Sequence, residues 1–143
     1  MSMMHHRYVG LDVHRATISV AICDPDQAPA SYGKIPNEPT AIHKLMQRLG
    51  GPERILHVAY EAGPTGYVVQ RQLTELSIEC LVVAPSLIPV RAGDRVKTDR
   101  RDALKLARLL RSGDLTPVWV PDAAHEALRD LVRAREAAKL AAE

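Results

Sequence analysis

The sequence predicts an α/β domain in which a mixed β-sheet is covered by helices. Three apolar, β-rich runs come first, at residues 7–13, 16–23 and 31–36, and the rest of the chain alternates helical and strand-like patterns. Early strands joined by short turns are typical of antiparallel pairing, whereas strands separated by helices are typical of parallel pairing. At 143 residues, the chain is long enough for one domain with its own core.

The first half of the chain is expected to form three strands and a helix. The runs RYVGLDV and ATISVAIC are separated by His14 and Arg15, a spacing that predicts a tight hairpin, and SYGKIP is expected to add an edge strand. Apolar residues then recur at helical spacing over 41–49, until Gly50 and Gly51 end that helix.

The second half is expected to alternate strands and helices. RILHVAYE predicts a fourth strand that ends at Glu61, and the turn GPTG leads into a helix with apolar positions between Tyr67 and Leu76. IECLVVA predicts a fifth strand. SLIPVRAGDRVKT is expected to be a loop or a short helix, followed by a helix over 100–111 and by LTPVWVP in an extended conformation.

The pattern divides the chain at residue 121. Residues 1–121 form the predicted sheet domain, and residues 122–143 form the start of a long amphipathic helix with Asp122 as a plausible N-cap. This helix is rich in Ala, Arg and Glu and reaches Glu143 without a stop signal. We therefore expect either that the chain is a fragment or that the helix pairs with another copy.

Four carboxylates stand in local contexts that indicate a metal site. Asp12 and Glu61 interrupt or end apolar runs, where an ionised carboxylate is costly without a neutralising partner. Asp99 and Asp102 are three residues apart at the start of a helical pattern, so both project from one face of its first turn. Hard oxygen donors on separate elements suit Mg²⁺ or Mn²⁺, and phosphodiester chemistry is the natural use of such a site.

Each of these carboxylates also has an alternative, structural role. Asp12 and Glu61 could simply belong to turns, Asp99 could be the N-cap of the helix, and Asp102 could interact with the helix dipole. Capping and metal binding are compatible, because a capping side chain is already held in one orientation. The occurrence of all four contexts in one small domain favours the metal site.

A basic stretch surrounds Asp99 and Asp102. Segment 91–111 contains eight basic and three acidic residues and so carries +5, whereas the whole chain carries a formal +2. A site that handles a polyanion needs such a stretch, although a solvated helix face is the alternative. The candidate nucleic-acid contacts in this segment are Arg91, Arg95, Lys97, Arg100, Arg101, Lys105 and Arg108.

Several other residues have both a functional and a structural interpretation. Thr65 and Gly66 are expected to open a helix, where backbone N–H groups could bind a phosphate, but capping by Thr65 explains the pattern equally well. Tyr67 and Trp119 could stack on bases or belong to the core. His14 could contact the substrate or serve only the hairpin turn.

Composition bounds the classes of protein to consider. No apolar run approaches the roughly 20 residues that a membrane span requires, and the N-terminus lacks the apolar core of a signal peptide. A cytoplasmic location without membrane contact is therefore the expectation. Cys23 and Cys80 lack metal-ligand spacing and are expected to be reduced core residues.

Three motifs together resemble a known family. YVGLDVHRATISVAI, YEAGPTGY and VKTDRRDALKLARLL closely resemble the N-terminal domain of the DEDD transposases of the insertion-sequence one-ten family, which is related to the Piv and MooV invertases. The resemblance extends from Tyr8 to about Leu140, and the third motif is the most specific of the three. At the four acidic positions the sequence does not depart from the family pattern.

The resemblance implies a RuvC-like, RNase H-type fold. A mixed five-stranded sheet flanked by helices would place the catalytic, metal-binding tetrad of Asp12, Glu61, Asp99 and Asp102 at one edge, followed by the start of a long C-terminal helix. It also implies a recombinase that moves an insertion sequence using Mg²⁺ or Mn²⁺, with two ions expected. A structured bridge RNA would guide the reaction by pairing with donor and target DNA.

The resemblance further implies parts beyond the sheet domain. In the family, a second, C-terminal domain supplies a serine nucleophile, and a coiled coil mediates assembly, which implies a dimer or tetramer of the full protein. Ser86 and Ser112 are not assigned to the nucleophile's role. We expect the chain to bind metal and nucleic acid without completing strand exchange alone.

Three other functions compete with this interpretation. A stand-alone nuclease or Holliday-junction resolvase of the same fold would cut DNA with metal-activated water. An actin-like kinase or ATPase is disfavoured, because residues 13–16 lack the glycine and hydroxyl groups that cradle phosphate. A non-catalytic RNA-binding or dimerisation module would use the carboxylates only structurally.

Overall fold

The computed structural model describes residues 4–84, 99–120 and 131–138, with the backbone alone for residues 99–101. Strands and helices alternate along this part of the chain largely as the sequence predicts. The elements are β1 (His5–Val13), β2 (Thr17–Cys23), β3 (Ala30–Pro36), α1 (Pro39–Leu49), β4 (Arg54–Glu61), α2 (Val68–Glu75), β5 (Glu79–Val83) and α3 (Asp99–Ser112).

The five described strands form one mixed sheet in the order β3-β2-β1-β4-β5. β1 pairs antiparallel with β2, which pairs antiparallel with β3, and the pairs β1–β4 and β4–β5 are parallel. The predicted mixed five-stranded α/β sheet is therefore confirmed, and the arrangement is consistent with an RNase H-like fold. β1 lies at its centre between β2 and β4, and Asp12 near its end pairs with Ser19 of β2.

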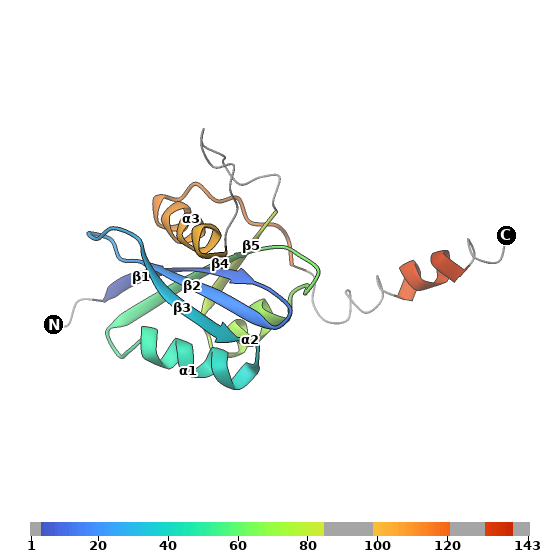
Figure 1. The fold of residues 1–143 in the computed structure, drawn as a ribbon, viewed down its shortest axis with the longest axis horizontal. Coiled ribbons are helices and arrows are strands. Elements are labelled where there is room, and N and C mark those ends of the chain that lie inside the picture. Colours follow the sequence, from blue (N-terminus) through green and yellow to red (C-terminus); the bar gives the residue numbers. More distant parts are fainter. Residues whose placement is uncertain (1–3, 85–98, 121–130, 139–143) are drawn as a thin grey trace.

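Helices cover both faces of the sheet. Figure 1 shows α1 and α2 on one side and α3 on the other. Because side chains alternate along a strand, β1 contributes Val9 and Leu11 to the face covered by α1 and α2, and Tyr8 and Gly10 to the face covered by α3. The main core lies under α1 and α2, and a smaller cluster of buried residues under α3 consists of Ala21, Cys23, Ala103 and Ala107.

Local sequence accounts for the limits of α1. Pro39 occupies the first turn, where its missing N–H group costs no hydrogen bond, and Gly50 follows the last residue. The buried positions recur at helical spacing, so one stripe of the helix packs on the sheet. These buried residues are Ile42, Leu45, Met46 and Leu49.

β3 is an edge strand, as predicted, and most of its residues are exposed. Its pairing with β2 shifts between Val20 and Ala21, whose partners are Gly33 and Ser31, so Tyr32 is an extra residue in a β-bulge. Gly33 has a φ of +142°, a backbone conformation that favours glycine. The strand is therefore irregular along the edge of the sheet.

The extended stretch after α3 contacts the opposite edge of the sheet. Pro117 forms an isolated antiparallel bridge with Val83, and the Val118 N–H group donates to the Val82 carbonyl at 2.8 Å. Within the predicted helix over 122–143, residues 131–138 are helical and exposed, and the remaining positions lie outside the described residues. The described part of the chain contains no helix of the length and apolarity needed to cross a bilayer.

Candidate metal centre

The parallel pairing of β1 with β4 brings two of the predicted carboxylates together. Leu11 pairs with Tyr60, and Asp12 and Glu61 follow them directly at the carboxyl ends of neighbouring strands. Both carboxylates are partly buried. Asp12 lies two residues beyond Gly10, so its side chain projects from the face that α3 covers, and Glu61 occupies the corresponding position on β4.

The hairpin turn after β1 contributes a contact to Asp12. His14 Nε2 lies 2.9 Å from Asp12 Oδ2, and the Asp12 side chain is 16% exposed. The turn is fixed at its base, because the His14 N–H group donates to the Thr17 carbonyl at 2.8 Å and Asn37 Nδ2 donates to the His14 carbonyl at 2.8 Å. His14 therefore belongs both to the turn and to the surroundings of the predicted site.

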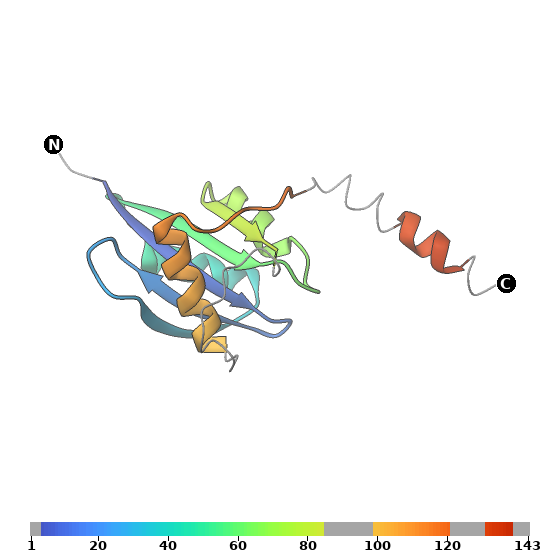
Figure 2. The same cartoon turned by 90° about the horizontal axis from the view of Figure 1, so that it is seen from above.

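Close packing of α3 on β1 orients the first turn of the helix toward the end of the sheet that holds Asp12. A Cβ atom added to Gly10 would lie 2.2 Å from the Ala103 carbonyl oxygen and 2.6 Å from the Ala107 nitrogen, so the helix backbone rests directly on the strand. Ala103 lies over Gly10, whereas Arg111 contacts residues that follow the far end of β2. The first turn of α3 therefore points toward the end that holds Asp12, as the course of the helix in Figure 2 indicates.

Asp99 and Asp102 both belong to that first turn. Asp99 is the first residue of α3 rather than the residue before it, which is where an N-cap would stand. Its side chain lies outside the described part of the chain. Asp102 is partly buried and lies one helical turn before the buried Leu106, so it borders the packed stripe of the helix.

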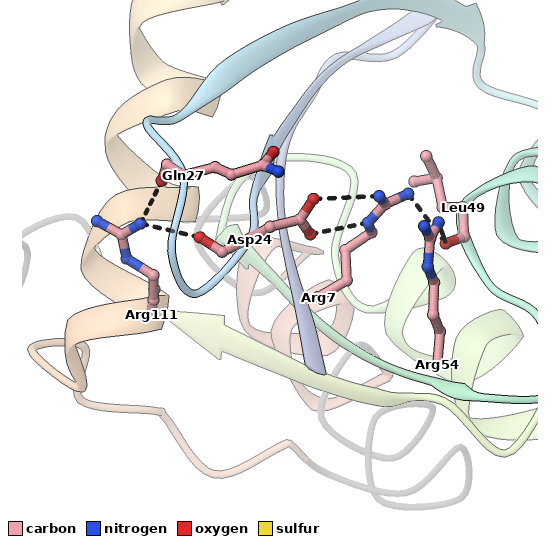
Figure 3. A network of polar contacts seen from close by, with 6 residues as sticks. All are labelled: Arg7, Asp24, Gln27, Leu49, Arg54 and Arg111. Atoms are coloured by element: carbon pink, nitrogen blue, oxygen red, sulfur yellow. Dashed lines mark hydrogen bonds and ion pairs between the residues drawn. The ribbon is translucent and has the colours of Figure 1, made fainter. Parts of the chain in front are cut away.

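A polar network fixes the opposite end of α3 (Figure 3). Arg111 donates to the carbonyl oxygens of Asp24 at 3.0 Å and Gln27 at 2.6 Å. The Asp24 carboxylate accepts two hydrogen bonds from Arg7, at 2.9 Å and 3.1 Å. Arg7 also donates to the Leu49 carbonyl at 3.2 Å, so the network connects α3, β1, the end of β2 and α1.

The described carboxylates Asp12, Glu61 and Asp102 do not by themselves form a metal-binding group. Among the described residues, no three His, Cys, Asp or Glu side chains are grouped closely enough to hold a metal ion. Asp12 and Glu61 nevertheless provide hard oxygen donors side by side, which suits Mg²⁺ or Mn²⁺. The tetrad as a whole, which includes the Asp99 side chain, stays a prediction.

Two residues that were not predicted from the sequence lie in line with Asp12 on the next two strands of the sheet. Asp12 pairs with Ser19 on β2, and Ser19 pairs with Lys34 on β3, so the three side chains form a row on the face covered by α3. Ser19 is 4% exposed, and its Oγ atom has no hydrogen-bond partner in the described structure. A serine within an apolar run and a lysine in an edge strand were visible in the sequence, but the row depends on strand register.

The basic residues predicted to contact nucleic acid are only partly described. Arg91, Arg95 and Lys97 lie outside the described residues, and Arg100 and Arg101 lie in α3 with only their backbone described. Lys105 and Arg108 lie on α3 outside the fully buried stripe, and both are partly exposed. The structure thus places two described basic side chains on the helix that carries Asp102.

The prediction that Thr65 and Gly66 open a helix is wrong. Helix α2 begins at Val68, its N-cap residue is Tyr67, and no side chain caps it. Thr65 and Gly66 lie in the preceding turn, where the Gly66 N–H group donates to the Gly63 carbonyl at 3.0 Å. A contact of these two residues with nucleic acid stays a prediction. It cannot rest on the free N–H groups of a helix N-terminus, because α2 begins after them.

The aromatic and cysteine residues divide between core and surface. Of the two alternatives left open for the aromatic residues, Trp119 is 73% exposed and so does not belong to the core, whereas Tyr67 packs against the main core. Both cysteines are free thiols, as predicted. Burial raises the pKa of the Cys23 thiol, partly offset by Arg111, and burial raises the pKa of Cys80 to about 12. Neither thiol is therefore activated as a nucleophile.

Comparison with known proteins identifies the family. The IS110-type DEDD transposase family matches residues 9–141. The y4qE protein of Sinorhizobium fredii, whose name assigns it to the transposases, is 47% identical over 133 residues, which are 92% of this chain and 34% of that protein. The transposase for insertion sequence element IS1533 of Leptospira borgpetersenii is 38% identical over 135 residues, which are 93% of this chain and 39% of that protein.

The chain thus spans little more than a third of the length of these two relatives. Among solved structures, the ethanolamine utilization protein EutJ from Carboxydothermus hydrogenoformans matches with 12% identity and a TM-score of 0.39, covering 57% of this chain and 38% of that one. A likeness of that degree carries no weight here, whereas the family match covers nearly every residue. The chain belongs to the DEDD transposases of the IS110 type.

Proposed function

We propose that this chain is the metal-dependent, phosphodiester-cleaving part of a DNA transposase. The observation that carries the proposal is the parallel register of β1 and β4, which places Asp12 and Glu61 side by side on the face that α3 crosses. Membership of the transposase family supplies the class of reaction. The substrate would be DNA at the ends of an insertion sequence and at its target.

In this proposal, each part of the site has a separate task. Asp12 and Glu61 from the sheet, with Asp99 and Asp102 from α3, would hold Mg²⁺ or Mn²⁺. The bound cation would polarise the scissile phosphate and stabilise charge on the leaving oxygen. Lys105 and Arg108, together with the basic residues before them, would hold neighbouring phosphates.

His14 would limit the movement of the Asp12 carboxylate. Its Nε2 atom contacts Asp12 Oδ2, and the turn that carries it is anchored through Asn37. Residues that hold a ligating carboxylate in one orientation support metal affinity in many metalloproteins. The hairpin turn thus serves the proposed site as well as the fold.

The complete reaction is proposed for the full-length protein, because the chain spans only 34% and 39% of the two relatives. We propose that strand transfer there is guided by a structured RNA and is carried out by a homo-oligomer. Both statements are supported by the family, and the basic segment 91–111 supports binding of nucleic acid. This chain would contribute cation and nucleic-acid binding.

Calorimetric titration with Mn²⁺ tests the metal site in this chain. Wild type is expected to bind Mn²⁺ saturably, and Asp12→Asn, which keeps the size of the side chain, is expected to lose that binding. Asp26→Asn is the matched control, because Asp26 is an exposed carboxylate in the loop between β2 and β3, beyond the opposite end of β2. Equal Mn²⁺ affinity in wild type and Asp12→Asn would contradict the proposal.

DNA cleavage by the full-length protein tests the chemistry. With Mg²⁺ present, cleavage at the ends of its insertion sequence is expected to fall at least about 100-fold in Asp12→Asn, as is typical when a transition-state stabiliser is lost. Asp26→Asn is expected to retain wild-type cleavage. Wild-type cleavage by Asp12→Asn would assign the carboxylates a structural role only.

A further inference from the structure

Ser19 is a polar residue in an apolar part of the sheet. It lies inside β2 between Ile18 and Val20 and is buried. Its Oγ atom makes no hydrogen bond there. A buried hydroxyl without a hydrogen-bond partner lowers the stability of the folded state. The contacts of the metal-free protein therefore do not explain why this position has a hydroxyl group.

The neighbours of Ser19 explain why the residue at this position is small, but they do not explain why it has a hydroxyl group. On the same face, Ala21 packs against Ala103 and Ala107, and Gly10 admits the α3 backbone. Close approach of α3 thus requires small residues in this part of the sheet. Alanine would satisfy that requirement without leaving a polar atom unpaired.

Strand register places Ser19 beside Asp12, one of the predicted metal ligands. Ser19 and Asp12 are cross-strand partners on one face, a geometry in which Cβ atoms lie about 4.5–5.5 Å apart. In the structure the Asp12 carboxylate contacts His14, which lies further along the chain toward the turn. Ser19 approaches Asp12 from the adjacent strand, so the two residues flank the carboxylate from different directions.

We propose that Ser19 is a positioning residue for Asp12. When the carboxylates hold a divalent cation, the Ser19 hydroxyl donates a hydrogen bond to the Asp12 carboxylate and fixes the oxygen that faces the ion. Such donors outside the ligand set commonly change metal affinity by 10- to 100-fold. The inference rests on the proposed function, because it requires Asp12 to be a metal ligand.

Ser19→Ala separates this role from a structural one. It removes only the hydroxyl, so the metal-free variant is expected to unfold at the same urea concentration as wild type or at a higher one. Its Mn²⁺ affinity, measured by calorimetry with and without a DNA duplex, is expected to fall about 10- to 100-fold.

The matched control is Ser31→Ala, which removes a hydroxyl from an exposed strand residue and is expected to leave Mn²⁺ binding unchanged. Wild-type Mn²⁺ affinity in Ser19→Ala, alongside loss of binding in Asp12→Asn, would overturn this inference and leave the proposed function intact. Absence of Mn²⁺ binding by wild type in both conditions would overturn both. A lower stability of metal-free Ser19→Ala than of wild type would also overturn the inference, since this result would show that the hydroxyl already has a hydrogen-bond partner without the metal.

Discussion

Gly10 shows how a single residue controls the predicted site. The α3 backbone approaches β1 so closely that even a methyl group at position 10 would lie 2.2 Å from the Ala103 carbonyl oxygen. Glycine is therefore required by the close approach of the helix, because real Cβ atoms essentially never come that near another atom. Any side chain here would move the helix that carries Asp102.

Gly10→Ala is expected to lower the free energy of unfolding by about 2–3 kcal/mol, since the added methyl group overpacks the contact between helix and strand. Urea unfolding measures this change. Gly63→Ala is the matched control, because the nearest atom to its added Cβ, the Glu61 carbonyl oxygen, lies 4.0 Å away. Equal losses in the two variants would show that α3 does not rest on Gly10 in solution.

Cys80 makes the stability of the chain sensitive to high pH. Desolvation in its partly buried position raises the pKa of its thiol to about 12 in the folded protein, whereas the unfolded thiol ionises at about its ordinary value near 8.5. Between these values the unfolded chain releases a proton that the folded chain retains, so stability falls as pH rises. Below pH 8 the thiol is largely protonated in both states.

Comparison of wild type with Cys80→Ala by urea unfolding at pH 7.5 and pH 10 tests this dependence. The loss of stability between the two pH values is expected to be smaller in the variant by about 1–2 kcal/mol, because only wild type carries the shifted thiol. A loss of the same size in both proteins would contradict the burial of the Cys80 thiol.

Among the elements, α3 depends most on long-range contacts. Hydrophobic periodicity predicted this helix to within one residue at each end, because periodicity is a local property of the chain. The same pattern did not predict the partners of Arg111, which lie 84 and 87 residues away along the sequence. Those partners become visible only once β2 and α3 are packed together.

Arg111→Gln is expected to lower protection of α3 amides from hydrogen exchange and to reduce stability by about 1–2 kcal/mol, because two carbonyl oxygens lose a charged donor. Hydrogen exchange measured residue by residue separates α3 from the rest of the chain. Arg48→Gln on the exposed side of α1 is the control. Unchanged protection of α3 would show that its anchor lies elsewhere.

Strand register marks the limit of what the sequence could predict about the site. Asp12 and Glu61 were recognised because each interrupts or ends an apolar run, and their proximity follows from parallel pairing of β1 with β4. The row formed with Ser19 and Lys34 depends on two further pairings, and a shift of one residue in either would turn those side chains to the other face. Thr65 was misplaced because a Gly-Pro-Thr-Gly turn and a helix start have similar local signals.

The two faces of the sheet have different expected uses. α1 and α2 cover the main core on one face, whereas α3 on the other face carries Asp102 and the partly exposed Lys105 and Arg108. Nucleic acid bound at the predicted site would therefore contact the α3 side. Charges on α1 would lie too far away to contribute to the salt dependence of binding.

Lys105→Ala is expected to weaken DNA binding and to reduce the slope of log affinity against log salt concentration by about one, because one phosphate contact is lost. Fluorescence anisotropy at several salt concentrations measures both quantities. Lys44→Ala removes an exposed charge from α1 and is expected to leave the slope unchanged. A greater effect of Lys44→Ala than of Lys105→Ala would place the nucleic acid on the opposite face.

The irregular edge formed by β3 restricts how copies of the chain can associate. An open edge strand offers unpaired N–H and C=O groups to any other strand, and a regular edge would allow two sheets to merge into one. The bulge at Tyr32, the positive φ of Gly33, the charge of Lys34 and the missing N–H group of Pro36 all obstruct such pairing. Continuous sheets across subunits are therefore disfavoured at this edge, and any assembly is expected to join its copies through other surfaces.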